Sequence, residues 1–195
     1  MTRIEVSSAG AVTTVTMANP ERHNALSSDA CERMAAALRE VAHDQSVRCV
    51  VLEGAGDSFC SGIDLASGMG VQSPAEELEG GLNAIATALL RMQKPTVAGV
   101  DGPAVGAGAA IATACDFVYA AESTVFQWGF TNIGLAPDTG ATYVLPRLVG
   151  LRRAMELLTT GREVSAAEAV DLGIATESIP DEEFDAVLDE RVEML

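Results

Sequence analysis

The sequence predicts a single domain of the α/β class. Short runs of apolar and β-branched residues, typical of strands, alternate along the chain with segments whose apolar residues recur at helical spacing. This alternation of strand and helix characterises the α/β class. No clear linker divides the 195 residues, which are enough to bury a core, so one domain is expected.

The first elements are a strand, a helix and a second strand. Residues 12–17 alternate and are β-branched, which predicts a strand. A helix should follow a serine that can cap it, at position 27 or 28. Its predicted apolar face consists of Ala30, Met34, Leu38 and Val41. Residues 49–52 are continuously apolar, as expected of a strand covered on both faces.

The alternation continues through the rest of the chain. Residues 82–91 are predicted to be helical and to end before Pro95, because the residue before a proline avoids helical conformation. Residues 96–100 and 116–119 are predicted strands, and residues 102–114 turn into a helix of very small residues. Further helices are expected over residues 140–149, 152–159, 166–172 and 182–195.

Charge and composition exclude several classes of protein. Asp and Glu number 28 and Lys and Arg number 12, which gives a formal net charge of −16. Nucleic acids and anionic membranes require clustered basic residues, so neither is an expected partner. Four cysteines and two histidines lack metal-ligand spacing, so we expect no metal site and no disulfide framework. No basic region precedes an apolar run at the N-terminus, which favours a cytoplasmic location over secretion.

Two segments rich in small residues would leave the backbone accessible to a ligand. Residues 59–65 follow a predicted strand and turn, and residues 102–110 connect a predicted strand to a helix. Free N–H groups at a helix N-terminus favour negative charge. Two N–H groups converging on one point would form an oxyanion hole. The alternative for the second segment is a closely packed helix start with no ligand.

Several short motifs occur in one order along the chain. They are Asn19-Pro20, Asn24-Ala25-Leu26-Ser27, Phe59-Cys60-Ser61-Gly62-Ile63-Asp64-Leu65, Lys94-Pro95, Gly106-Ala107-Gly108, Cys115-Asp116, Ile133-Gly134-Leu135-Ala136-Pro137-Asp138 and Leu145-Pro146-Arg147. This order resembles the enoyl-CoA hydratase/isomerase (crotonase) superfamily over residues 12–179. The resemblance implies a crotonase-like ββα superhelix that binds an acyl-CoA thioester. Coenzyme A would then be part of the substrate, and no separate cofactor is expected.

The resemblance also implies roles for individual residues. The thioester oxygen would accept hydrogen bonds from the N–H groups of Ile63 and Ala107; the family usually has glycine at the second position, but alanine keeps the N–H. The coenzyme A path would involve Arg22, Ala25, Ser61, Gly62, Ile63, Asp64, Leu65 and Gly106. Arg22 is alternatively a solvated surface charge. Trp128 and Phe130 are expected to be walls of an acyl pocket or part of the core.

The acidic residues decide which reaction is expected. Hydratases of the family use two glutamates, but the matching positions hold Ala110 and Phe130, which cannot transfer protons. Asp138 remains in this neighbourhood, and isomerases similar to the phenylacetate-pathway ring isomerase carry an aspartate there. The pattern therefore favours double-bond isomerisation of an enoyl-CoA, with Asp138 as the proton shuttle. Its apolar neighbours would raise its pKa and make it a better base.

Other interpretations stay open. Chlorobenzoyl-CoA dehalogenases carry the same aspartate, but they add a histidine and a tryptophan where this chain has Asn83 and Phe130. Hydration or thioester hydrolysis could use the same oxyanion hole. The missing glutamates would also fit a non-catalytic acyl-CoA binder. Asp138 itself could instead cap a helix that begins near Thr139.

The resemblance finally implies a domain boundary and an assembly. Residues 1–180 should form the acyl-CoA-binding core, and residues 181–195 should begin a shortened C-terminal helical region. Family members form homotrimers, often stacked into hexamers, and the same assembly is expected here, although its helices would lie in the shortened region. The net charge of −16 would repel coenzyme A, a polyanion, unless basic residues offset it locally.

Overall fold

A computed structural model describes residues 1–67 and 79–195. Its centre is a six-stranded sheet in which β1 and β2 pair antiparallel and the other neighbours pair parallel. In spatial order the strands are β1 (Arg3–Ala9), β2 (Val12–Ala18), β3 (Cys49–Gly54), β4 (Thr96–Val100), β6 (Phe117–Ala121) and β9 (Glu177–Ile179). The predicted α/β class is therefore confirmed.

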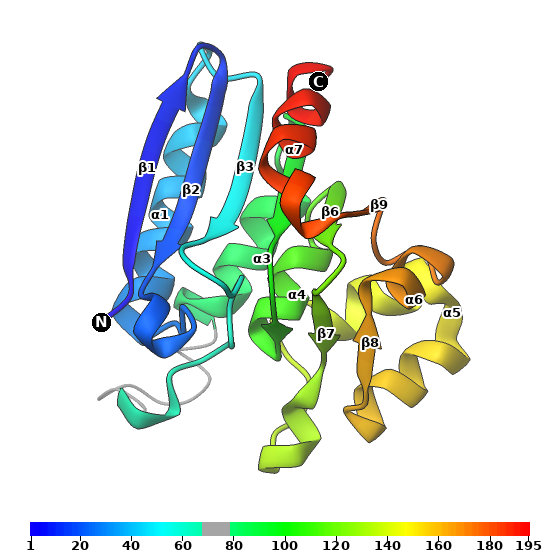
Figure 1. Cartoon of the computed structure of the whole chain (residues 1–195). Helices are drawn as coiled ribbons and strands as arrows, with labels where there is room; N and C mark the ends of the chain where they lie inside the picture. The colour runs from blue at the N-terminus through cyan, green and yellow to red at the C-terminus, as the bar shows by residue number, and fades with distance from the viewer. Residues whose placement is uncertain (68–78) are drawn as a thin grey trace.

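Helices cover both faces of this sheet (Figure 1). One face carries α1 (Ser28–His43), α3 (Leu82–Leu90) and α4 (Ala107–Thr113), and the other carries α7 (Phe184–Glu193). In α1 the side chain of Ser27 accepts a hydrogen bond from the N–H of Ala30 at 3.3 Å, and all four predicted apolar residues are buried. None of the described helices is both long and apolar enough to cross a membrane.

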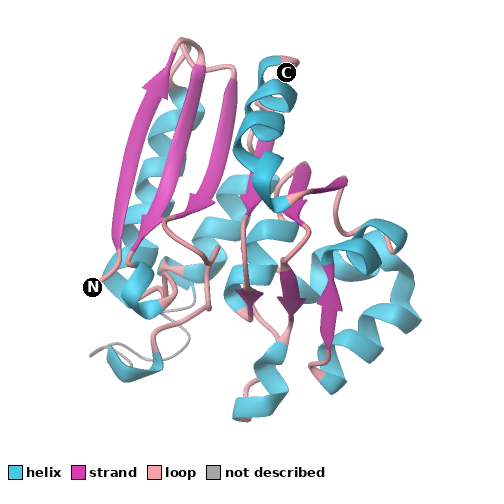
Figure 2. Cartoon of the chain, in the orientation of Figure 1, coloured by secondary structure: helices cyan, strands magenta, loops and turns pink. Residues whose placement is uncertain are grey.

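A smaller three-stranded sheet continues the fold beside the first one (Figure 2). It consists of β5 (Ala104–Val105), β7 (Val125–Gln127) and β8 (Glu163–Ser165), and it is accompanied by α5 (Ala141–Thr160) and α6 (Ala166–Asp171). The helices predicted over residues 140–149 and 152–159 meet within α5 at a kink. Gly150 interrupts the helix there with φ +75°, a conformation that glycine adopts without steric cost.

Five of the strands in the described chain are absent from those that the sequence predicts. β5, β7, β8 and β9 have two or three residues each, which is too short to show an alternating pattern. β1 has seven residues but lies at the edge of the large sheet, and only Ile4 within it is even half-buried. Ile4 and Val6 nevertheless alternate with polar residues, so the sequence does carry a weak signal for this strand.

The central strands separate two apolar clusters. Val50 and Leu52 of β3 face the α1 side, whereas Cys49 and Val51 face α7. A Cβ atom added to Gly99 would lie 2.6 Å from Leu188 Cδ2, so α7 packs directly against the backbone of β4. Residues 181–193 form η4 (Asp181–Glu183) and α7 and belong to the packed fold. A boundary at residue 180 stays a prediction.

Candidate active site

Asn24 fixes the loop that precedes α1. Its side-chain amide donates hydrogen bonds to the carbonyls of Ala55 at 3.0 Å and Ser58 at 2.6 Å, and its Oδ1 accepts from the N–H of Asn19 at 2.8 Å. The residue is fully buried and has φ +55°, a region that asparagine tolerates better than most residues. Asn24 therefore ties this loop to the chain that leaves β3, a role that the sequence analysis did not assign.

The segment after β3 runs between two neighbouring stretches of backbone. Cys60 forms an isolated parallel bridge with Ala104, and Ile63 forms one with Leu26. The N–H of Leu26 donates to the Gly62 carbonyl at 2.7 Å, and the N–H of Asp64 donates to the Leu26 carbonyl at 2.8 Å. In such a bridge the residue between the two bonded groups directs its own N–H to the opposite side. The N–H of Ile63 therefore points away from Leu26.

The backbone N–H groups of Ile63 and Ala107 have no hydrogen-bond acceptor within the described part of the chain. Ala107 is the first residue of α4, where a helix offers no acceptor of its own. The two segments approach closely at Gly62, where an added Cβ would lie 3.2 Å from the Ala107 nitrogen and 2.9 Å from the Val105 carbonyl oxygen. Because Gly62 also has φ +90°, only glycine allows this approach without strain.

Both segments line one cavity of about 160 Å³. The η3 turn (Gly129–Ile133) and the chain that follows it close the other side. The lining residues are Ser61, Gly62, Ile63, Leu65, Val105, Gly106, Ala107, Gly129, Phe130, Ile133, Leu135 and Asp138. Asp138 has the only ionisable side chain among these residues. The cavity therefore brings together both predicted amide donors and the predicted base.

Asp138 is a carboxylic acid in a largely apolar setting. Burial raises its pKa above the ordinary aspartate value, and a hydrogen bond from the Thr139 hydroxyl at 2.6 Å opposes this shift. Thr139 is fully buried and has φ +52°. The helix α5 begins only at Ala141, after the N-cap residue Gly140, and within the described chain no backbone N–H donates to the Asp138 carboxylate. The alternative that Asp138 caps this helix is therefore wrong.

Arg22 and Asp64, both predicted to contact coenzyme A, pair with each other. Arg22 Nη2 lies 2.9 Å from Asp64 Oδ1, and just over half of the arginine side chain is exposed. The carboxylate offsets the charge that would attract a phosphate. Ala25 lies outside the cavity lining and is buried, and its carbonyl accepts a hydrogen bond from the Thr2 hydroxyl.

The two aromatic residues of this region lie in different places. Phe130 lines the cavity and is buried. Trp128 is absent from the lining; it is fully buried in the core and stacks on Phe126, with ring centroids 6.4 Å apart. Of the two predictions for Trp128, pocket wall or core, the structure supports the core. The tryptophan supports the turn from which Phe130 reaches the cavity.

The site can polarise a carbonyl and move one proton. Two unpaired amides can bind a developing negative charge on oxygen, and Asp138 can accept and return a proton. Ala110 is buried within α4 and Phe130 is apolar, so neither adds a second acid. Among the described residues, no group of three or more His, Cys, Asp or Glu side chains could hold a metal ion.

Comparisons with known proteins agree with this architecture. The family model described as "Enoyl-CoA hydratase/isomerase" matches residues 7–195. A solved enoyl-CoA hydratase from Mycobacterium avium subsp. paratuberculosis superposes with a TM-score of 0.92 at 34% identity, covering 98% of this chain and 77% of that one. The chain therefore belongs to the enoyl-CoA hydratase/isomerase family and has the crotonase fold that its sequence motifs predict.

Curated relatives carry different activities in their names. The 1,2-epoxyphenylacetyl-CoA isomerase of Escherichia coli is 38% identical over 88% of this chain and 67% of its own length. A 4-chlorobenzoyl coenzyme A dehalogenase of an Arthrobacter species is 34% identical over 98% of this chain and 71% of its own length. The chain spans about two thirds of the length of the curated relatives it matches. The relatives thus agree on coenzyme A thioesters but differ in reaction.

Proposed function

We propose that this protein is an acyl-CoA isomerase that shifts a double bond in an enoyl-CoA thioester. The observation that carries the proposal is the cavity in which, among the described lining residues, Asp138 is the one ionisable side chain beside the amides of Ile63 and Ala107. One base and one oxyanion hole suffice for a proton to leave one carbon and return to another. Coenzyme A enters as part of the substrate, and the reaction needs no further cofactor.

The proposed reaction conserves all atoms of a 3-enoyl-CoA. The Asp138 carboxylate removes a proton from C2, beside the thioester carbonyl, and the electron pair of that bond enters the conjugated system. Negative charge gathers on the thioester oxygen, where the two amides donate hydrogen bonds. The protonated Asp138 then returns the proton to C4, which leaves a 2-enoyl-CoA and restores the carboxylate. Burial raises the pKa of Asp138, and a carboxylate with a raised pKa is a stronger base. This shift favours removal of the proton from C2.

The proposal is tested by removing the base and keeping the shape of the side chain. Asp138→Asn should lower kcat for conversion of 3-hexenoyl-CoA to 2-hexenoyl-CoA by about 10²–10⁴-fold. Calorimetric affinity for a saturated acyl-CoA should change little, because the two amides remain. Asp171→Asn, at the end of α6, is the matched control and should leave turnover unchanged. Unchanged turnover in Asp138→Asn would remove this residue from the mechanism.

Hydration is the second candidate, because related solved structures carry hydratase names. It is opposed by the apolar side chains at positions 110 and 130, where the resemblance implies the glutamates of hydratases. The two reactions differ in the source of oxygen. In isotopically labelled water, hydration places labelled oxygen in the product, whereas isomerisation gives an unlabelled isomer of the same mass, apart from exchanged hydrogen. Labelled oxygen in the product would replace the isomerase proposal.

The assembly and the compartment belong to the same proposal. We propose a homotrimer or hexamer, which the family resemblance implies, and a cytoplasmic location. Light scattering coupled to gel filtration would measure the mass of the particle in solution. A monomer that turns over enoyl-CoA at full rate would contradict the proposed assembly without affecting the proposed chemistry.

A further inference from the structure

Apart from the carboxyl of Asp138, the described lining of the cavity presents an uncharged and largely apolar surface to the group that enters it. Ile63, Val105, Phe130, Ile133 and Leu135 contribute apolar side chains to its lining. Among the described residues of the lining, none is a Lys, Arg or His that could neutralise an anionic acyl group. A carboxylate at the far end of the acyl chain would lose its hydration on entering the cavity without gaining a basic partner. It would also lie near the carboxyl of Asp138, which has the same charge when ionised.

The volume of the cavity limits the size of that group. The space measures about 160 Å³. An engineered apolar cavity of about 150 Å³ is filled by one benzene molecule. The space described here therefore accepts one six-membered ring, or an aliphatic chain of about six carbons. A longer chain that extends toward the core would have to displace a wall, and overfilling a packed site is unfavourable.

Phe130 closes the cavity on the side of the core. This residue is only 5% exposed, whereas Ile133 and Leu135 are 51% and 43% exposed and lie toward solvent. The N–H of Leu135 donates to the Phe130 carbonyl at 2.9 Å, which closes the turn and fixes the backbone of the phenylalanine. The fully buried Trp128 lies just before this turn. Phe130 is therefore the wall that a longer acyl chain would meet.

We propose that Phe130 sets an upper limit on the acyl group, so that the site selects coenzyme A thioesters of a neutral, apolar group no larger than one six-membered ring. This inference rests on the proposed function, because it places the acyl group in the cavity beside Asp138. It assigns Phe130 a specificity role at the position where hydratases are implied to carry a glutamate.

The test measures binding without turnover. Calorimetric dissociation constants are determined for the unreactive thioesters butyryl-, hexanoyl-, octanoyl-, decanoyl- and phenylacetyl-CoA, and for adipoyl-CoA, which carries a terminal carboxylate. Hexanoyl- and phenylacetyl-CoA should bind best. Decanoyl- and adipoyl-CoA should each bind at least about tenfold more weakly than hexanoyl-CoA. Phe130→Ala should move the preferred length toward octanoyl- or decanoyl-CoA.

Two further variants distinguish a change in acyl-chain preference from a loss of folding. Phe130→Leu retains an apolar side chain and should show the same shift to a smaller degree. Phe117→Leu makes the same change in β6, on the α7 side of the sheet, and should leave the length preference of the wild type intact. Equal affinity for hexanoyl- and decanoyl-CoA, or a preference unaffected by Phe130→Ala, would overturn the inference.

The outcome also separates this inference from the proposed reaction. A length limit without any isomerase turnover would support the size limit and contradict the isomerase. Turnover with no length limit would contradict the size limit alone. Failure of every acyl-CoA to bind would overturn both.

Discussion

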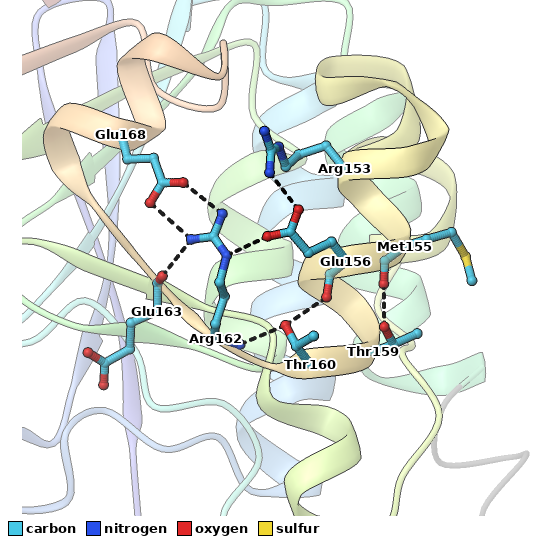
Figure 3. Close-up of polar contacts among 8 residues, drawn as sticks. All are labelled: Arg153, Met155, Glu156, Thr159, Thr160, Arg162, Glu163 and Glu168. Carbon is cyan, nitrogen blue, oxygen red and sulfur yellow. Dashed lines mark hydrogen bonds and ion pairs between the residues drawn. The ribbon is translucent and has the colours of Figure 1, made fainter.

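Two regions near opposite ends of α5 use carboxylates in opposite ways. At the start of this helix, Asp138 lines the apolar cavity, and none of the described lining residues is basic. Near its end, Glu156 and Glu168 bind the guanidinium of Arg162 (Figure 3). Arg162 Nε lies 2.9 Å from Glu156 Oε1, and Nη2 lies 2.7 Å from Glu168 Oε1. Arg153 also contacts Glu156, and we call these four residues the Arg162 cluster.

The difference shows how surroundings decide what an acid can do. Hydrogen bonds from Arg162 lower the pKa values of Glu156 and Glu168, so these carboxylates stay charged at neutral pH and act as ties between α5 and α6. Burial raises the pKa of Asp138, so this carboxyl can accept a proton more readily than an exposed aspartate. The cavity is therefore arranged for proton transfer, whereas the Arg162 cluster is arranged to hold elements together.

The largest effect on activity is expected when an amide donor is removed from the cavity. Ala107→Pro deletes the N–H at the first position of α4, where proline is well tolerated. We expect kcat for the 3-enoyl-CoA to fall by about 10²–10³-fold, since each oxyanion donor contributes mainly in the transition state. Circular dichroism should show an intact fold. Ala109→Ser, a change of similar size that keeps its N–H, is the control; a fully active Ala107→Pro would refute the role of this amide.

A smaller effect is expected when only the pKa of Asp138 is altered, which would show that its surroundings tune it as a base. Thr139→Ala removes the hydroxyl that donates to its carboxylate at 2.6 Å. The charged form loses support, so the pKa of Asp138 should rise further and the acid limb of log kcat/KM against pH should move to higher pH. Activity should fall several-fold at low pH and recover as the pH rises. Thr139→Ser keeps the hydroxyl and should restore the original profile, and an unmoved profile in Thr139→Ala would indicate a purely structural role.

The smallest effect is expected in the Arg162 cluster, and it should change stability alone. Arg162→Met should lower the free energy of unfolding by about 1 kcal/mol and leave turnover unchanged, because the pairs are partly exposed to water. Glu156 and Glu168 have lowered pKa values in the folded state, so their contribution is complete above the ordinary glutamate value of 4.5 and is lost as the pH falls through the lowered values.

Urea unfolding at neutral and acidic pH would measure this effect. The difference between Arg162→Met and the wild type should shrink at acidic pH, where the glutamates become protonated. A difference that persists or grows on acidification would show that the arginine stabilises the fold through packing rather than through charge. Loss of turnover in Arg162→Met would contradict the assignment of the Arg162 cluster to stability alone.

Much of the fold follows from local pattern. The helix α1 begins after its capping serine and buries the apolar face that its spacing predicts, and β2, β3, β4 and β6 lie where short apolar or β-branched runs predict them. The break within α5 at Gly150 was likewise predicted. The edge strand β1 was not predicted, because the apolar alternation of Ile4 and Val6 is short and the strand is largely exposed. The two- and three-residue strands were not predicted, because their pairing depends on neighbours distant in sequence.

By itself the sequence determined the α-helices described here, the strands β2, β3, β4 and β6, and the two segments of small residues at the cavity. Helical spacing, caps and glycine conformations act between near neighbours, so local sequence encodes them. Only the tertiary structure decided that Phe130 rather than Trp128 lines the cavity, and that Arg22 pairs with Asp64, 42 positions away. It also decided that Asp138 accepts a hydrogen bond from Thr139 instead of capping α5. Each of these outcomes depends on where a side chain points once distant segments have packed, and no local pattern encodes that direction.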